Sequence, residues 1–198
     1  LYPNKLRLQY FFIILILLGV PLNLYNNRFY DNSWTIGEWL ISYKGGFVRR
    51  GLPGQIIHII SENFTISPIH LVWFISVFSI TSLVFIILYF GNDFFDTSLL
   101  LSQIIILAPI SENFLVRKDS FLVLLFGLCL FTLKKTFEGS LKKHYCIIII
   151  NIFSIIAILS HESFGIWGLP SISLILLIYE RCKGKNLFKS FLFLFFAL

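Results

Sequence analysis

The segment from residue 43 to residue 54, YKGGFVRRGLPG, holds the densest set of groups that could bind an anion. Arg49 and Arg50 carry planar guanidinium groups, which suit bidentate contact with a phosphate, and Lys44 adds a third cation. The closely spaced glycines allow backbone conformations with positive φ and close approach of another group. The segment predicts a cradle for a lipid phosphate or diphosphate. Alternatively, the arginines bind bulk anionic lipid and the glycines only make a turn before a helix.

A second charged group follows an apolar stretch at Arg117-Lys118-Asp119, with Glu112 just before it. Ionisable side chains at membrane depth cost about 2.5–3.5 kcal/mol on insertion scales, so they usually pair or line a cavity. In one interpretation, Arg117 or Lys118 binds a phosphate and Asp119 orients it, with a divalent cation such as Mg²⁺ or Mn²⁺. In the other, Glu112 and Arg117 form a structural clip.

Three further acids and one histidine could move a proton. His161 and Glu162 are adjacent, and a histidine beside a carboxylate can act as a base or a phosphate partner. The alternative for this pair is a solvated helix cap. Asp31 and Glu38 lie near Trp34 and Trp39, whose rings could stack on a sugar while a carboxylate takes a proton from an attacking hydroxyl. Asp31 and Glu38 could equally be ordinary loop charges.

The composition places these groups in a membrane protein. The chain is 57% hydrophobic and 13% charged, against about 25% charged residues in a soluble domain. Zinc-binding, Walker, dinucleotide-binding and serine-elbow signatures are absent from the sequence. The three cysteines have spacings typical of neither a metal site nor a redox pair.

Six stretches approach the length of about 20 mainly apolar residues that a spanning helix needs, and a seventh begins near Leu187. We expect an all-α polytopic membrane helix bundle of six spans plus the start of a seventh, forming one transmembrane domain over residues 1–198. The chain has no methionine and ends within an apolar run, so we expect a piece of a longer protein. The predicted spans are Leu6–Leu24, Ile69–Phe90, Ser98–Val116, Ser120–Leu133, Tyr145–Ser160 and Phe164–Tyr179.

Basic residues in the short loops set the expected orientation. With six spans, ten of them fall on one side, which the positive-inside rule assigns to the cytoplasm. The N-terminus is then cytoplasmic, and the candidate residues described above face outward from a bacterial inner membrane. The net charge of +6 comes from the basic residues on the cytoplasmic side and so reflects membrane orientation. We therefore expect membrane lipids and no nucleic acid as partners. These ten residues are Lys5, Arg7, Lys134, Lys135, Lys142, Lys143, Arg181, Lys183, Lys185 and Lys189.

Residues 25–68 form the one long outer loop. Its second half, Pro53–Phe64, carries most of its isoleucines along one helical stripe, which predicts a helix lying in the membrane interface. Trp34, Trp39 and Tyr43 indicate a similar interfacial piece before it, because aromatic rings with a polar edge favour the headgroup level.

This layout resembles the GT-C superfamily of membrane glycosyltransferases, including bacterial enzymes of cell-envelope polysaccharide assembly. The resemblance rests on one span before a long outer loop with an acid and interfacial helices, then many spans joined by short loops. It also rests on three short segments, Glu38–Gly54, Arg117–Asp119 and Ser160–Ser163. The family's usual acidic pair in the first outer loop is not clear in this sequence.

The resemblance implies a polyprenyl-phosphate or polyprenyl-diphosphate sugar donor, a glycan or lipid acceptor, and in some members a divalent metal. It implies that Glu38 or Asp31 is the base. The phosphate partners that it implies are Arg49, Arg50, Arg117 and Lys118. Two rival hypotheses stay open: a transporter or flippase for an anionic lipid-linked substrate, and a non-catalytic scaffold subunit of an envelope complex. The transporter would use polar or helix-breaking positions near mid-membrane, for which the candidates are Pro109, Glu112, Asn151 and Pro170.

Overall fold

The computed structural model describes residues 18–19, 33–90 and 117–182, and the secondary structure of these ranges is helical throughout. An all-α fold is therefore confirmed for the described residues. The span predicted over 98–116 and the start of a seventh lie outside them, as does the span over 6–24 except for residues 18–19. The described elements are α2 (Ser33–Leu40), the 3-10 turn η1 (Tyr43–Gly45), α3 (Leu52–Phe64), α4 (Pro68–Phe90), α7 (Lys118–Phe137), α8 (Lys143–Ser160) and α9 (Ser163–Cys182).

Three of these helices, α4, α7 and α8, are long and apolar enough to cross a membrane, which indicates a membrane protein. α9 contains a shorter apolar stretch, Ser163–Tyr179. The span predicted over Ser120–Leu133 is too short, because α7 continues to Phe137. Lysine is a good helix former, so the helix runs on through Lys134 and Lys135 after the apolar run has ended.

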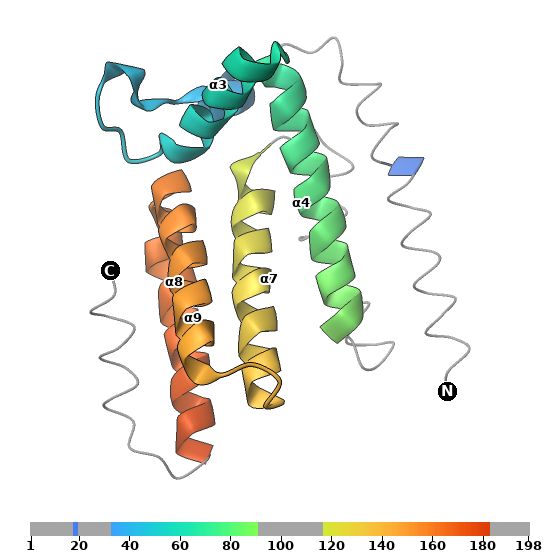
Figure 1. Cartoon of the computed structure of the whole chain (residues 1–198), viewed down its shortest axis with the longest axis vertical. Coiled ribbons are helices and arrows are strands. Elements are labelled where there is room, and N and C mark those ends of the chain that lie inside the picture. Colours follow the sequence, from blue (N-terminus) through green and yellow to red (C-terminus); the bar gives the residue numbers. More distant parts are fainter. Residues whose placement is uncertain (1–17, 20–32, 91–116, 183–198) are drawn as a thin grey trace.

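The four long helices stand side by side, and α3 lies across one end of them (Figure 1). We call this the α3 end; it also holds α2, the start of α7 and the turn between α8 and α9. The opposite end carries the loop between α7 and α8. α4 finishes at that opposite end, whereas α7 begins at the α3 end. Between the end of α4 and the start of α7 the chain therefore returns from one end of the bundle to the other. The span predicted over 98–116 would make this crossing, and it lies outside the described residues.

Two buried clusters hold the helices together. The larger joins α7, α8 and α9 through residues such as Leu125, Ile150 and Ile172. The smaller consists of Trp39, Ile57 and Val72, with Phe121 packed against it, and so fastens α2, α3 and α4 to the start of α7. The core at the α3 end thus determines where the loop before α3 lies.

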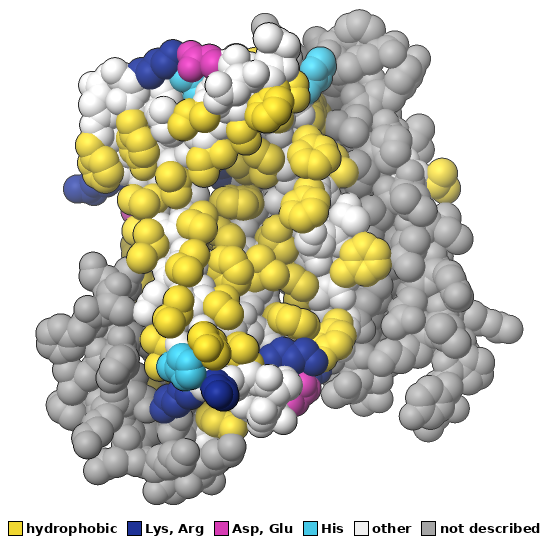
Figure 2. Space-filling model, viewed as in Figure 1, with side chains coloured by type: hydrophobic (Ala, Val, Ile, Leu, Met, Phe, Trp, Pro, Cys, Tyr) yellow, Lys and Arg dark blue, Asp and Glu magenta, His cyan; other side chains and the backbone are white. Residues whose placement is uncertain are grey.

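The outward faces of the long helices are apolar and exposed. They include Phe74, Phe78 and Phe85 on α4 and Ile148, Ile152 and Ile155 on α8. Figure 2 shows hydrophobic side chains over the middle of the molecule and charged side chains at its two ends. Several hydroxyl groups inside the helices bond to carbonyl oxygens four residues earlier, as Ser76 does to Val72 and Ser79 to Ile75, so these groups do not need water.

Two glycines shape the segment before α3. Gly46 has a φ of 115°, a conformation that favours glycine. Gly54 packs so closely that a Cβ atom there would overlap the carbonyl group of Ile41. The expectation of positive φ and close backbone approach in this segment is met at these two positions.

Replacing Gly54 by alanine should destabilise the fold, because the added methyl group meets backbone atoms that cannot rotate away. We expect a loss of about 1–3 kcal/mol, the usual cost of overpacking. Thermal unfolding in detergent would measure it. The matched control is Gly37→Ala in α2, where a Cβ meets nothing within 4 Å. Equal stability of the two variants would contradict the close approach.

Candidate functional site

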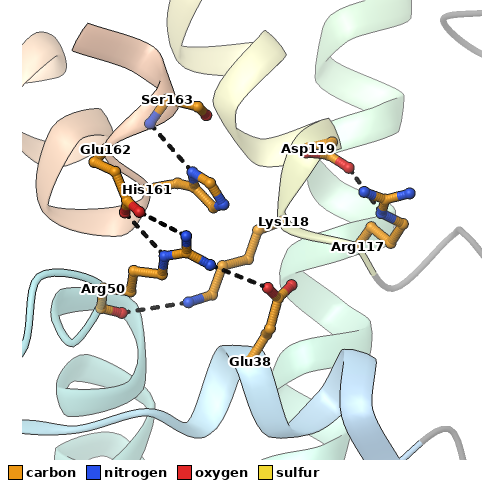
Figure 3. A network of polar contacts seen from close by, with 8 residues as sticks. All are labelled: Glu38, Arg50, Arg117, Lys118, Asp119, His161, Glu162 and Ser163. Atoms are coloured by element: carbon orange, nitrogen blue, oxygen red, sulfur yellow. Dashed lines mark hydrogen bonds and ion pairs between the residues drawn. The ribbon is translucent and has the colours of Figure 1, made fainter. Parts of the chain in front are cut away.

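Arg50 lies at the centre of a charged network at the α3 end (Figure 3). Its Nε and Nη2 atoms donate to the two carboxylate oxygens of Glu162, at 2.9 and 2.6 Å. Its Nη1 atom lies 3.5 Å from Oε1 of Glu38. One guanidinium group therefore joins carboxylates from two different parts of the chain, one of them 112 residues away.

Each member of the network comes from the end of a helix or close to one. Glu38 lies in the last turn of α2, Arg50 immediately precedes the Gly51 N-cap of α3, and Glu162 lies in the turn between α8 and α9. The Leu52-Pro53 pair favours a helix start here, because proline is well suited to the first turn. The Trp39 and Ile57 core contacts fix α2 and α3, and thereby bring Glu38 and Arg50 together.

Lys118, the first residue of α7, is buried beneath the network with 2% of its surface exposed. Its Nζ atom donates to the carbonyl oxygen of Arg50 at 3.3 Å. The charges of Glu38 and Glu162 favour the ammonium and offset part of the cost of burying it. The sequence predicts Lys118 as a phosphate ligand; in the structure the side chain is buried and contacts the loop that carries Arg50.

Glu162, predicted as a catalytic residue beside His161, is engaged by Arg50 in the structure. The pKa of this carboxyl is lowered to about 2, first by the hydrogen bonds from Arg50 and then by a backbone hydrogen bond and the charge of Arg50. The same contact raises the pKa of Arg50. Because both oxygens of Glu162 accept hydrogen bonds from one cation, it acts as the fixed counter-ion of Arg50.

Glu38 is the network carboxylate whose oxygens still have unused hydrogen-bond acceptor positions. It has one long contact with Arg50, and 28% of its side chain is exposed. A carboxylate has about four acceptor positions, so Glu38 can still accept a proton or a hydroxyl hydrogen bond from the open side. The geometry is compatible with the base role that the sequence predicted for it.

His161 adjoins the network at the end of α8. The backbone N–H of Ser163 donates to its Nδ1 atom at 3.2 Å. This contact assigns the proton of the neutral imidazole to Nε2, which is then a hydrogen-bond donor. His161 is half-buried. It can thus offer an N–H group to an anion at the α3 end.

The remaining predicted residues do not join this network. Arg49 is exposed and makes no hydrogen bond or ion pair within the described ranges, whereas Lys44 pairs with Glu62 at 3.0 Å. Arg117 and Asp119 pair with each other at 2.8 Å, on the other side of the start of α7 (Figure 3). Asp31 and Glu112 lie outside the described residues. Of the ten predicted residues, the structure therefore brings together Glu38, Arg50, Lys118 and Glu162, with His161 beside them.

The described residues do not fit a divalent metal. Over residues 33–90 and 117–182, no three His, Cys, Asp or Glu side chains gather in a group that could hold a metal ion. Asp119, the predicted ligand, is occupied by Arg117, and Glu38 and Glu162 both face the Arg50 guanidinium. The Arg50 guanidinium thus lies between Glu38 and Glu162, where the two carboxylates could otherwise have bound a metal ion together.

Trp39 has a structural role that differs from the predicted one. It was expected at the headgroup level, with a ring available to a sugar, but it is fully buried and packs on Phe121 at a centroid distance of 5.8 Å. Thr35 and Trp39 are four residues apart, a spacing that places both side chains on one face of a helix. Both are buried in the structure, so this spacing is the sequence signal that could have indicated the burial of Trp39. Gln55 was also missed: its Oε1 accepts the backbone N–H of Tyr43 at 3.1 Å and ties the loop to α3.

Comparison with known proteins gives no relative: no family model, curated protein or solved structure matches the chain. Function is therefore argued from the chemistry of the network and its place on the helices.

The Arg50–Glu162 pair should make stability depend on pH. The folded-state pKa of Glu162, about 2, lies below its ordinary value of 4.5, so the stabilisation is present at neutral pH and is lost as the pH falls from 4.5 toward 2. Since 41% of this side chain is exposed, solvent screens the pair. We expect Glu162→Gln to lower the unfolding temperature by only about 2–4 °C at pH 7, and less at lower pH.

Thermal unfolding of the wild type and Glu162→Gln in detergent from pH 7 to pH 3 would measure this effect. Arg50→Gln is the companion variant and should show the same loss of pH dependence, because it removes the other half of the pair. A difference between wild type and variant that does not change with pH would contradict the assignment.

Proposed function

We propose that the protein is a membrane glycosyltransferase or polymerase that uses a polyprenyl-phosphate-linked or polyprenyl-diphosphate-linked sugar at the non-cytoplasmic face, in cell-envelope polysaccharide or glycolipid assembly. One observation carries the proposal. A partly exposed carboxylate, Glu38, is held beside a fixed guanidinium at the end of helices long enough to cross a membrane. A lipid-linked donor would present its phosphate and sugar at that level.

Glu38 is the base in this proposal. An acceptor hydroxyl would give its proton to the Glu38 carboxylate while its oxygen forms a bond to the anomeric carbon of the donor sugar. The bond between that carbon and the phosphate oxygen breaks, and its electron pair leaves with the phosphate. Arg50 orients Glu38 through the 3.5 Å contact, and Glu162 holds Arg50 in place.

The departing phosphate needs cations or N–H donors that are not already engaged. Arg49 meets this condition, because it is exposed and makes no hydrogen bond or ion pair within the described part of the chain. The Nε2–H group of His161 is a second donor at the same end of the bundle. Together they offer the phosphate a charge-assisted contact and a neutral one.

The distribution of lysines supports placing the α3 end outside. Lys134, Lys135, Lys142 and Lys143 all lie at the opposite end, around the loop between α7 and α8. Short loops rich in lysine stay in the cytoplasm. At the α3 end, cations are balanced by acids, as in the pairs of Arg50 with Glu162 and Lys44 with Glu62.

Glu38→Gln should abolish glycan product while leaving the amount of protein in the membrane unchanged, because the amide keeps the shape of the side chain but cannot take up the proton. Product formed from a labelled polyprenyl-phosphate hexose by membranes containing the full-length protein would be measured. The matched control is Glu62→Gln on α3, which changes the contacts of an exposed carboxylate with Lys44 and His58. Normal product from Glu38→Gln would remove the proposal.

Arg49→Ala should raise the donor concentration needed for half-maximal rate by about tenfold, the equivalent of roughly 1.4 kcal/mol for one charge-assisted contact. Arg49→Lys should recover part of this loss because it keeps the charge. Lys142→Ala, at the opposite end, is the control. If donor dependence is the same in all four proteins and labelled donor instead crosses the bilayer of proteoliposomes without product, the rival transporter hypothesis is correct.

A further inference from the structure

The loop formed by residues 43–49 carries an ordered apolar tip. We call it the projecting loop, because it extends sideways from the α3 end beyond the upright helices (Figure 1). The rings of Tyr43 and Phe47 stack at a centroid distance of 5.5 Å, with 10° between their planes. Backbone hydrogen bonds of 3.0 Å close turns on both sides, from Gly46 N–H to the Tyr43 oxygen and from Gly51 N–H to the Val48 oxygen. The apolar tip thus has a defined shape.

The tip is poorly suited to water. Phe47 is 78% exposed and Val48 is 41% exposed, side by side in the sequence. The exposed Ile56 and Ile59 of α3 add to the apolar surface at this end of the molecule. Apolar surface gathered in this way marks an interaction site with a protein or a membrane.

The charges on the loop favour a phospholipid surface over a protein. Lys44 and Arg49 are exposed on the two sides of the apolar tip. Such cations can reach lipid phosphates while neighbouring aromatic and aliphatic side chains enter the boundary between headgroups and acyl chains. The loop also lies at the level where the long apolar helices end, which is where that boundary would be.

We propose that, when no sugar donor is bound, the projecting loop inserts Phe47 and Val48 into the headgroup–acyl boundary of the bilayer that surrounds the helices. Arg49 then binds an anionic phospholipid headgroup, and Lys44 exchanges its exposed pair with Glu62 for a second one. The insertion anchors the segment that ends at Arg50. It does not depend on sugar transfer, since it requires only the bilayer.

The test places a nitroxide spin label at residue 47 through Phe47→Cys, in the full-length protein with its native cysteines replaced by alanine, in lipid nanodiscs. We expect oxygen, which dissolves in the bilayer, to relax the label more than an aqueous nickel chelate does. The control is Glu62→Cys on α3, whose side chain is 59% exposed and polar, and there the nickel chelate should dominate. Dominance of the chelate at residue 47, or protection from both reagents, would overturn the insertion.

Lipid composition tests the role of the cations. The label at residue 47 should report greater depth in nanodiscs of phosphatidylglycerol than in phosphatidylcholine, and K44Q/R49Q should remove that difference. The same depth in both lipids would overturn the headgroup contact.

A second measurement covers the case in which the cysteine-free protein does not fold. Phe47→Trp, made with the native cysteines present, should gain fluorescence that brominated acyl chains quench, relative to the wild type in the same nanodiscs. Quenching equal to that of the wild type would overturn the proposal. Because no sugar donor is used in these experiments, their failure would leave the glycosyltransferase proposal to its own assay.

Discussion

The arrangement of the α3 end depends on the bidentate contact between Arg50 and Glu162. A planar guanidinium that meets both oxygens of one carboxylate fixes direction as well as distance. The contact joins the loop before α3 to the turn between α8 and α9, two segments whose paired residues are 112 positions apart. It also leaves Nη1 of Arg50 to face Glu38. Glu162 thus helps to orient the guanidinium that faces Glu38, while the core around Trp39 positions α2.

Packing and electrostatics support each other around this pair. Trp39 and Ile57 bring α2 and α3 together without polar atoms, and the closeness allowed by Gly54 lets α3 pass against the segment after α2. Lys118 then closes the network from below through the carbonyl oxygen of Arg50. Solvent screens the partly exposed pairs of Arg50, whereas the Lys118 ammonium is buried and depends on the nearby carboxylates to offset the cost of its burial. The network is therefore a structural unit of the fold as well as a candidate site.

The sequence predicts the helices of this protein better than its contacts. Apolar periodicity places the start of α3, and the length of an apolar run places the start of α4, each within one residue of the observed position, because both signals are local. The same local signals group Arg49 with Arg50 as equivalent phosphate ligands, yet one is exposed and the other is bound by Glu162. That difference depends on α3 lying across the end of α8, a long-range contact that composition does not encode. The burial of Lys118 and Trp39 could not be predicted for the same reason, since each side chain is buried by segments distant in sequence.

The buried ammonium of Lys118 has a consequence for how α7 sits in a bilayer. A helix whose first residue is bound to a neighbouring loop cannot slide along its axis without pulling a charge out of its pocket. At its other end α7 carries Lys134 and Lys135, whose long side chains can extend or fold to follow the water boundary. In a bilayer of different thickness, the mismatch should therefore be taken up at the lysine end, while the depth of the α3 end stays constant.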